Sequence, residues 1–344
     1  MRLNRRQTLA LVAATTAAAC HKRQLTTPTP RGAMDTRVLD AGFPALALKA
    51  RPGAFAMGVM DLATTKTWYW NTDRGFPLAA AAALPIAAAA MAQVDAGKLA
   101  LAEPVRFDAL DLSPPFSLIS QYWPDPPDNR STTIRAGDLI ALALREGDST
   151  AMDVLDKRIG GPGEVSAFLQ TKGVLGLRVD RYQRQIAADM FAMPSFRAAW
   201  KSQSAFDAAR STVSPKTRQA AMDRFILDPR DTATAPAALG FLALLAGGEL
   251  VSAASARALL GWMQTAPGGL FRAGLPAGVA LAHTPGATRT DLGFTPATTE
   301  LAIASFPSGR RYALAGFLVG STATAEQCRA LFAAGAALAA RAIG

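Results

Sequence analysis

The chain has 344 residues, of which 50% are hydrophobic and 7% aromatic, so it can form one large or two modest globular domains and is not a disordered chain. Its formal net charge is +10, but the basic residues are scattered and form no dense run. Nucleic-acid binding would require a clustered basic face or a known motif, and the sequence has neither, so we expect no nucleic-acid partner.

Residues 1–20 have the pattern of an export signal. A twin arginine, Arg5-Arg6, precedes an apolar run from Leu9 to Ala19 that is too short for a stable membrane span. Small residues then lead to Cys20, as in a lipoprotein cleavage site, which makes Cys20 a candidate for lipidation. The alternative is ordinary signal cleavage with Cys20 incidental. Either way, we expect an exported protein located in the periplasm, membrane-tethered if Cys20 is lipidated.

Residues 21–37 are rich in Thr, Pro and basic side chains, which predicts a flexible tether. The only cysteines are Cys20 and Cys328, so lipidation of the first would leave no partner for a disulfide. Two His and two Cys, of which His21 and Cys20 lie in or next to the tether, cannot build a metal site of ordinary spacing. We therefore expect no metal and no cofactor.

The first regular elements after the tether are two strands. Ala54–Asp61 alternates bulky and small residues, and Thr67–Trp70 is its predicted hairpin partner. From Pro77 to about Gly274 the pattern becomes helical and the strand signal disappears. Thr133 and Ser149 are predicted to cap helices within this block. The other expected helices cover 164–172, 236–246 and 252–263.

Strands return near the C-terminus, at 278–283, 299–306 and 311–320, before a closing helix over 325–343. Because a lone two-stranded hairpin is not stable, the first and last parts of the chain must share one antiparallel sheet. We expect a single α+β domain over 38–344. Its α/β part would be formed by 38–75 and 275–344, and 76–274 would be an inserted helical part.

Several site classes are excluded by their motifs. The sequence contains no Gly-x-Ser-x-Gly elbow and no phosphate-binding loop. A Ser-His-Asp triad could use only His283, and a single His beside a strand is more often structural.

The order of landmarks resembles the class A β-lactamases, a family of serine hydrolases. Phe76-Pro77-Leu78, the following apolar helix and Val94–Leu99 resemble the active-site helix of that family. Further landmarks fall in the family's order and approximate spacing: Asp231–Pro236, Gly248–Leu250, Trp262–Thr265, Leu275–Gly278 and the hairpin Ser305–Gly316. The resemblance covers residue 38 to the C-terminus. It implies an α/β (α+β) fold with an antiparallel sheet of about five strands, flanked by helices and carrying an all-helical subdomain.

The resemblance also implies acyl transfer. In the family, a serine attacks the lactam carbonyl, a lysine one helical turn later helps remove its proton, and a glutamate activates the hydrolytic water. None of these side chains is present at the matching positions. The serine and lysine positions are Ala80 and Ala83, the Ser-Asp-Asn motif reads Gly147-Asp148-Ser149, the glutamate and its assisting asparagine are Gln183 and Ala187, and the Lys-Thr-Gly motif reads Thr284-Pro285-Gly286.

A displaced motif does not replace the missing one. The chain has eight lysines, and none is preceded three residues earlier by Ser, Thr or Cys. Pro285 also lacks an N–H and therefore fits poorly in a paired central strand.

What survives is the backbone. The family's oxyanion hole uses two main-chain N–H groups, which would here belong to Ala80 and Ala287. Arg272 and Arg289, near the closing strands, are candidate contacts for an anion. The cleft would then bind a carbonyl or carboxylate without cleaving it. The alternative is a cleft filled by Ala and Pro side chains that binds nothing. Asp148 and Ser149 are better explained as a helix cap than as a site.

The leading hypothesis is therefore an exported, monomeric pseudoenzyme of this family that acts by binding or scaffolding in the cell envelope. Its candidate partners are cell-wall peptide, a β-lactam or an envelope protein. A second hypothesis is an active hydrolase with a non-standard nucleophile such as Ser149 or Thr284. A third, an unrelated binding module, predicts that the termini form no five-stranded sheet.

Overall fold

The computed structural model describes residues 33–114, 117–122, 131–197 and 199–343. Residues 33–344 cluster as one compact unit. The export signal, Cys20 and most of the predicted tether lie outside the described residues. The last residues of the predicted tether already belong to the folded unit, because Met34 is buried and helix α1 begins at Thr36.

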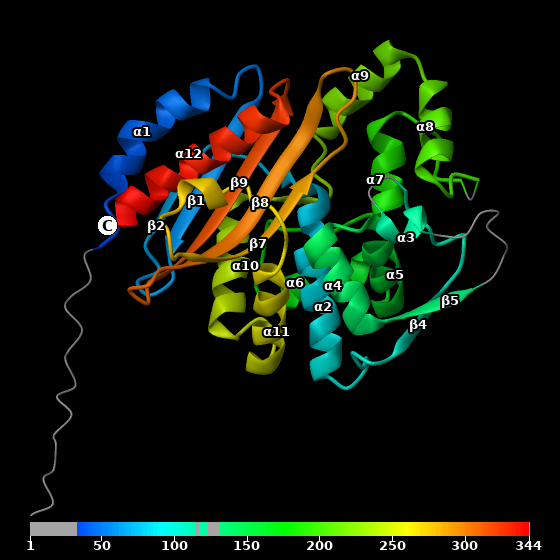
Figure 1. Cartoon of the computed structure of the whole chain (residues 1–344), viewed down its shortest axis with the longest axis horizontal. Helices are drawn as coiled ribbons and strands as arrows, with labels where there is room; N and C mark the ends of the chain where they lie inside the picture. Colours follow the sequence, from blue (N-terminus) through cyan, green and yellow to red (C-terminus); the bar gives the residue numbers. More distant parts are fainter. Residues whose placement is uncertain (1–32, 115–116, 123–130, 198, 344) are drawn as a thin grey trace, which may run out of the picture. The chain divides into compact units, whose positions relative to one another are not determined.

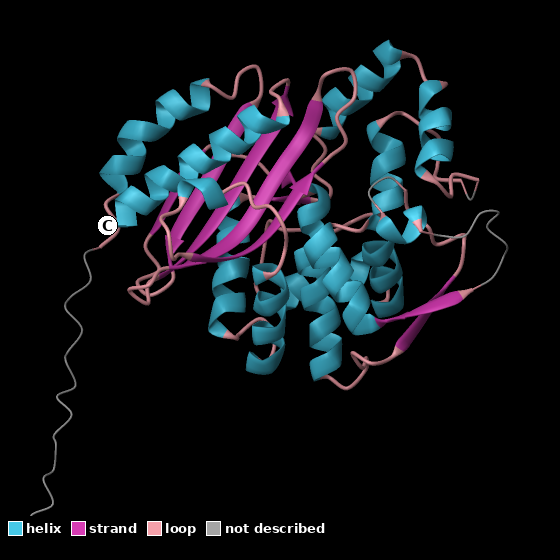
Figure 2. Ribbon diagram, in the orientation of Figure 1, coloured by secondary structure: helices cyan, strands magenta, loops and turns pink. Residues whose placement is uncertain are grey.

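Five antiparallel strands form the central sheet, in the order β2-β1-β9-β8-β7 (Figure 2). Their bounds are β1 Ala54–Asp61, β2 Thr67–Trp70, β7 Ala280–Ala287, β8 Thr295–Ser305 and β9 Arg311–Ser321. The first and last parts of the chain therefore share one sheet, as predicted. This pairing contradicts the hypothesis of an unrelated binding module.

Helices cover both faces of the sheet (Figure 1). Helix α1 (Thr36–Leu48) and helix α12 (Ala325–Ile343) pack together on one face, and α10 (Ala235–Gly247) and α11 (Ala253–Gln264) pack on the other. Strand β9 shows why both faces are needed. Ala315 and Phe317 enter the core on the α10 side, whereas Leu314 and Leu318 enter the core under α12. Since side chains alternate along a strand, an apolar run buries both faces.

The inserted part is mainly helical. Its elements are η1 Ala79–Ala82, α2 Ala83–Asp95, α3 Leu118–Gln121, α4 Ala136–Glu146, α5 Ser149–Ile159, α6 Pro162–Thr171, α7 Gln183–Met190, α8 Gln203–Ser211, α9 Pro215–Phe225, α10, α11 and η2 Arg272–Gly274. The prediction that this part contains no strands is wrong, because it includes two short strand pairs. Strand β3 (Phe76–Pro77) pairs with β6 (Thr232–Ala233), and β4 (Pro104–Phe107) pairs with β5 (Thr132–Arg135).

Both predicted helix caps are corrected by the structure. Thr133 lies in β5, opposite Arg106 of β4, because pairing with a distant strand outweighs the local capping preference. Helix α4 begins after Arg135 instead. Ser149 is the first residue of α5, and the cap is Asp148, whose side chain accepts a hydrogen bond from Ala151 N. In the described part of the chain, no helix is long and apolar enough to cross a membrane.

Candidate functional site

The site predicted from the resemblance begins at the turn before α2. Ala79 has a φ of +49°, a left-handed conformation that non-glycine residues seldom adopt and that often marks a functional site. Ala80 follows and is partly exposed. Ala83, one turn later, is fully buried in the apolar core. A lysine at that position would need a polar environment that Ala83 does not have.

Gly147 lies directly beside Ala80. A Cβ atom added to Gly147 would lie 3.3 Å from the Cβ of Ala80, although the two residues are far apart in the sequence. Gly147 ends α4 with a φ of +63°, which favours glycine. The structure therefore brings the first two motif positions together, as the resemblance implies, but neither residue carries a reactive atom.

The residue after Gly147 connects two helices through hydrogen bonds. Asp148 is fully buried, and its carboxylate accepts hydrogen bonds from Ala151 N at 2.8 Å, Ile119 N at 3.0 Å and Ser117 Oγ at 3.0 Å. It thereby fixes α3 against the start of α5. Ser149 is also buried. The interpretation of this pair as a structural cap is confirmed for Asp148.

Strand β7 forms the opposite wall. A Cβ atom added to Gly286 would lie 2.8 Å from Ala80 N and 2.3 Å from Ala81 N, so only glycine allows this approach. This contact places Ala287, which is exposed, close to the main chain of Ala80. The expected misfit of Pro285 does not arise, because β7 is an edge strand that pairs only with β8.

Thr284 is almost completely buried, and its Oγ1 has no hydrogen-bond partner among the described residues. Gln183 begins α7, and its main-chain N–H donates to Asp153 Oδ1 at 2.6 Å. Gln183 Nε2 is buried and has no hydrogen-bond partner within the described ranges, and Ala187 is buried one turn further on. The Gln183 segment is therefore held by its backbone and not by the side chain that would matter for catalysis.

Two buried carboxyl groups on α5 lie beneath this segment, and the sequence analysis did not identify them. Asp153 accepts hydrogen bonds from Gln183 N, Arg184 N and Ser113 Oγ, and burial nevertheless raises its pKa to about 6. Asp156 is 1% exposed, and neither of its carboxyl oxygens has a hydrogen-bond partner among the residues that the structure describes. Burial, and then the charges of Asp153 and Asp231, raise the pKa of Asp156 to about 8.

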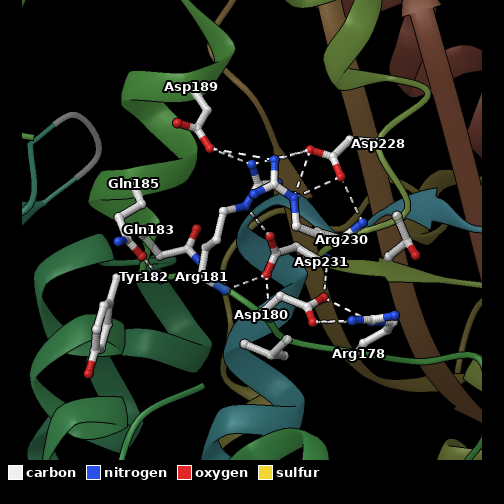
Figure 3. A network of polar contacts seen from close by, with 12 residues as sticks. Arg178, Asp180, Arg181, Tyr182, Gln183, Gln185, Asp189, Asp228, Arg230 and Asp231 are labelled. Carbon is white, nitrogen blue, oxygen red and sulfur yellow. Dashed lines mark hydrogen bonds and ion pairs between the residues drawn. The ribbon is translucent and has the colours of Figure 1, made fainter. Parts of the chain in front are cut away.

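A network of ion pairs ties together the two ends of the long segment from Asp180 to Asp231 (Figure 3). The buried Arg181 guanidinium donates from Nε to Asp231 at 2.7 Å, and its Nη1 lies 2.7 Å from Asp189 and 3.3 Å from Asp228. Asp231 also accepts from Asp180 N at 2.7 Å and from Arg181 N at 3.0 Å. Helices α7, α8 and α9 all lie between these two ends in the chain. The network therefore holds the start and the end of this helical segment together.

The two predicted anion contacts are not brought to the site as free cations. Arg289 forms an ion pair with Asp207 of α8 at 2.9 Å. Arg272 donates to Val279 O at 2.8 Å, next to the end of β7 that is remote from Ala287. The prediction is therefore wrong for Arg272, because η2 packs against α12. The charge of Arg289 is already paired with the carboxylate of Asp207. Sequence spacing could not show the pairing of Arg289, because Asp207 lies 82 residues earlier in the chain.

A second ion-pair cluster joins helices α8 and α9 of the same segment to the turn after β7. Asp291 lies 2.6 Å from both Arg210 of α8 and Arg218 of α9. Burial alone would raise the pKa of Asp291, but the hydrogen bonds from Arg218 and Arg210 outweigh it and lower the pKa. The α8–α9 segment is thus fixed to the loop that follows Ala287.

Comparisons with known proteins agree with this geometry. The sequence pattern of the beta-lactamase enzyme family matches residues 41–342. The chain is similar in structure to a beta-lactamase from Chitinophaga pinensis, with a TM-score of 0.72, 23% identity and coverage of 90% of this chain and 100% of that one. It is also similar to the last common ancestor of Gram-negative bacteria class A beta-lactamase, with a TM-score of 0.68, 25% identity and coverage of 88% and 100%. Because the match covers most of the chain and the fold agrees, this protein belongs to the beta-lactamase enzyme family and has the fold of the class A enzymes.

Proposed function

We propose that this protein is a catalytically silent member of the β-lactamase family that binds a ligand or partner in the cell envelope. The observation that carries the proposal is the set of residues at the site. Ala80, Gly147 and the backbone of Gly286 lie against one another, yet none supplies a nucleophile, a base or a proton relay. Acyl transfer needs such groups within hydrogen-bond reach of one another.

The buried positions support the same conclusion. Ala83 lies inside the apolar core, so the position of the missing lysine itself offers no proton acceptor. Gln183 cannot act as a base, and Thr284 supplies no cation. Both hydroxyls of the alternative enzyme hypothesis are buried. Thr284 Oγ1 is buried without a hydrogen-bond partner in the described part of the chain, and Ser149 is buried at the start of α5.

Binding would depend on the main chain. The N–H groups of Ala80 and Ala287 need no side chain to attract a carbonyl or carboxylate oxygen. The candidate ligands are a β-lactam, a cell-wall peptide or a segment of an envelope protein. Export supports an envelope location, and it rests on the twin arginine and the apolar run near the N-terminus.

The proposal is tested with the purified protein, a chromogenic cephalosporin and a labelled penicillin, with an active class A enzyme as positive control. We expect no turnover above a blank and no covalent adduct by mass spectrometry. Turnover or an adduct would contradict catalytic silence. In that case, loss of activity in Ser149→Ala or Thr284→Ala would identify the nucleophile, and survival of activity in both would exclude these two residues.

Reversible binding is measured separately, by equilibrium dialysis with the penicillin and with a cell-wall peptide. Ala287→Pro deletes one proposed N–H donor, and Arg272→Gln is the matched control because its guanidinium bonds at the other end of β7. We expect Ala287→Pro, checked for folding by its melting curve, to weaken binding while the control leaves it unchanged. Failure of both ligands to bind would refute a small-molecule role for the cleft.

A further inference from the structure

Two cavities adjoin at the C-terminal end of α10, on the sheet face that α10 and α11 cover (Figure 1). The larger has a volume of about 730 Å³ and the smaller a volume of about 290 Å³, which is the size range of small-molecule sites. They share three lining residues, Ala246, Gly247 and Arg311, so they meet at Arg311. Ala80 and Ala287 line neither cavity, so both cavities are separate from the candidate site.

The larger cavity is mainly apolar. Its walls come from the end of β1, the loop after α6 and one side of α10, and its larger apolar side chains are Met60, Leu62, Val174, Leu175 and Leu244. Leu175 is 73% exposed, so this wall offers apolar surface to a ligand. Gly240 lies on the α10 side, where an added Cβ atom would meet no heavy atom within 4 Å. The cavity is therefore open along the helix and suited to a hydrocarbon chain.

The smaller cavity is polar, and no acidic residue is among those that line it. Its hydrogen-bond donors come from Arg257 and Gln264 of α11, Ser305 of β8 and Arg311 of β9. Within the described ranges, the side chains of Arg257, Gln264 and Ser305 form no hydrogen bond or ion pair. Two guanidinium groups beside neutral polar groups favour a carboxylate or a phosphate, because arginine matches the geometry of both.

Arg311 connects the two cavities and already has one partner. Its Nη1 and Nη2 each lie 3.4 Å from Ala246 O, near the end of α10. This contact caps the helix, since a cation is favourable beside the last carbonyl groups. Both distances are long for hydrogen bonds, and they involve only one N–H of each terminal nitrogen. The other N–H groups have no acceptor in the part of the chain that the structure describes, so the guanidinium can still bind an anion.

The remaining charges decide how a ligand would be oriented. The larger cavity is also lined by Lys172 and Glu249, and Lys172 Nζ donates to the main-chain oxygen of Glu249 at 3.2 Å. The carboxylate of Glu249 would repel an anionic group in that cavity. In the smaller cavity, the charged lining residues are Arg257 and Arg311, both cationic. An anionic head group therefore fits the smaller cavity, with its apolar chain in the larger one.

We propose that the two cavities form one binding site for an anionic amphiphile, with a carboxylate or phosphate head group at Arg257 and Arg311 and a hydrocarbon chain along α10. Transfer of the chain out of water supplies affinity, and the guanidinium groups select the charged head group. The inference does not depend on whether the candidate site binds or cleaves a ligand, because the two sites share no residue with Ala80 or Ala287.

The first test separates the head group from the chain. Binding of dodecanoate, dodecyl phosphate, neutral dodecyl maltoside and acetate to the full chain is measured by titration calorimetry below micelle-forming concentrations. We expect both anionic amphiphiles to bind with one molecule per chain, and acetate and dodecyl maltoside to bind at least about tenfold more weakly. Equal binding of the neutral and anionic amphiphiles, or no binding of either anion, would overturn the proposal.

Phosphatidylglycerol vesicles present the same chemistry in a bilayer. If the protein sediments with these vesicles but does not bind dodecanoate, its cations serve a membrane surface and the proposed site is refuted.

Gly240→Leu tests the larger cavity, because leucine is compatible with a helix and its side chain would fill the open space. Gly261→Leu is the matched control, since Gly261 also lies in a helix with open space around it but lines neither cavity. We expect Gly240→Leu, checked for folding by its melting curve, to weaken dodecanoate binding at least about tenfold, and Gly261→Leu to leave it unchanged. Unchanged binding in folded Gly240→Leu would contradict the proposal.

Arg257→Gln tests the smaller cavity. Arg329→Gln is its control, because Arg329 is also an exposed helical arginine and removes the same charge far from the cavity lining. We expect Arg257→Gln to weaken dodecanoate binding about threefold or more, without changing the weak binding of dodecyl maltoside, and addition of Arg311→Gln to extend the loss to about tenfold or more. If the double variant fails to fold, Arg257→Gln alone still decides. An equal loss in Arg329→Gln would show a general effect of net charge and refute the site.

Discussion

Replacing Asp156 by Asn should remove a large pH dependence of stability. The carboxyl group is buried and has no hydrogen-bond partner in the described part of the chain, and burial raises its pKa from 3.8 to about 8. The folded state therefore binds a proton that the unfolded state has released, and the free energy of unfolding falls as pH rises from about 4 to about 8. Below this window the group is neutral in both states, and its ionisation no longer affects stability.

The magnitude follows from proton linkage. Each pH unit inside the window removes about 1.4 kcal/mol, so the carboxyl group costs about 4 kcal/mol at pH 7 relative to pH 4. Asn is also neutral and has nearly the same shape, but it cannot ionise. We therefore expect the variant to gain about 3 kcal/mol relative to wild type between pH 5 and pH 7.

The assay is urea unfolding of both proteins at pH 5, 6, 7 and 8.5, with the difference in free energy plotted against pH. The slope is the informative quantity, because any constant cost of burying the Asn amide cancels. Asp73→Asn, in an exposed loop, controls for the loss of one negative charge. Parallel curves for wild type and Asp156→Asn from pH 5 to pH 7 would show that the reasoning is wrong.

Three further changes test the framework of the site. Gly286→Ala should lower the free energy of unfolding by about 2 kcal/mol or more, because the new methyl group would clash with Ala81 N. Gly240→Ala is the control, since a methyl group there meets open space and should cost nothing measurable by urea unfolding. Arg181→Gln leaves buried carboxylates unpaired and should cost about 3 kcal/mol, measured likewise, and an unchanged midpoint would contradict this. Asp291→Asn should destabilise the protein above about pH 5 and lose this effect in acid, because Asp291 has a lowered pKa; equal destabilisation at pH 3 and pH 7 would contradict that assignment.

The landmarks of the central sheet could be predicted because they depend on local pattern. Ala54–Asp61 and Thr67–Trp70 have the predicted bounds, and the closing helix Ala325–Ile343 does as well. Strand β7 is longer than expected, because an edge strand can continue through Pro285. Thr133 was assigned to a cap because the pairing of β5 with β4 depends on residues about thirty positions earlier.

The candidate site was predicted in its positions but not in its contacts. The resemblance placed Ala80, Gly147 and Gly286 in one motif set, and the structure brings them together. The two arginines near the closing strands, Arg272 and Arg289, were predicted as anion contacts, yet each has a hydrogen-bond or ion-pair partner. No signal in the sequence distinguishes a free surface arginine from a paired one, because the fold determines which groups lie beside it.

The sequence by itself determined which chemistry is missing. No Ser-x-x-Lys occurs in any register, and no folding can create a nucleophile at Ala80 or a base at Ala83. Only the tertiary structure decided which ionisable side chains have a shifted pKa. Asp156 looks unremarkable in the sequence, and its pKa is raised only because the fold buries it near other carboxylates. The physical reason is that side-chain identity is local, whereas solvation and charge partners depend on what the fold packs around each group.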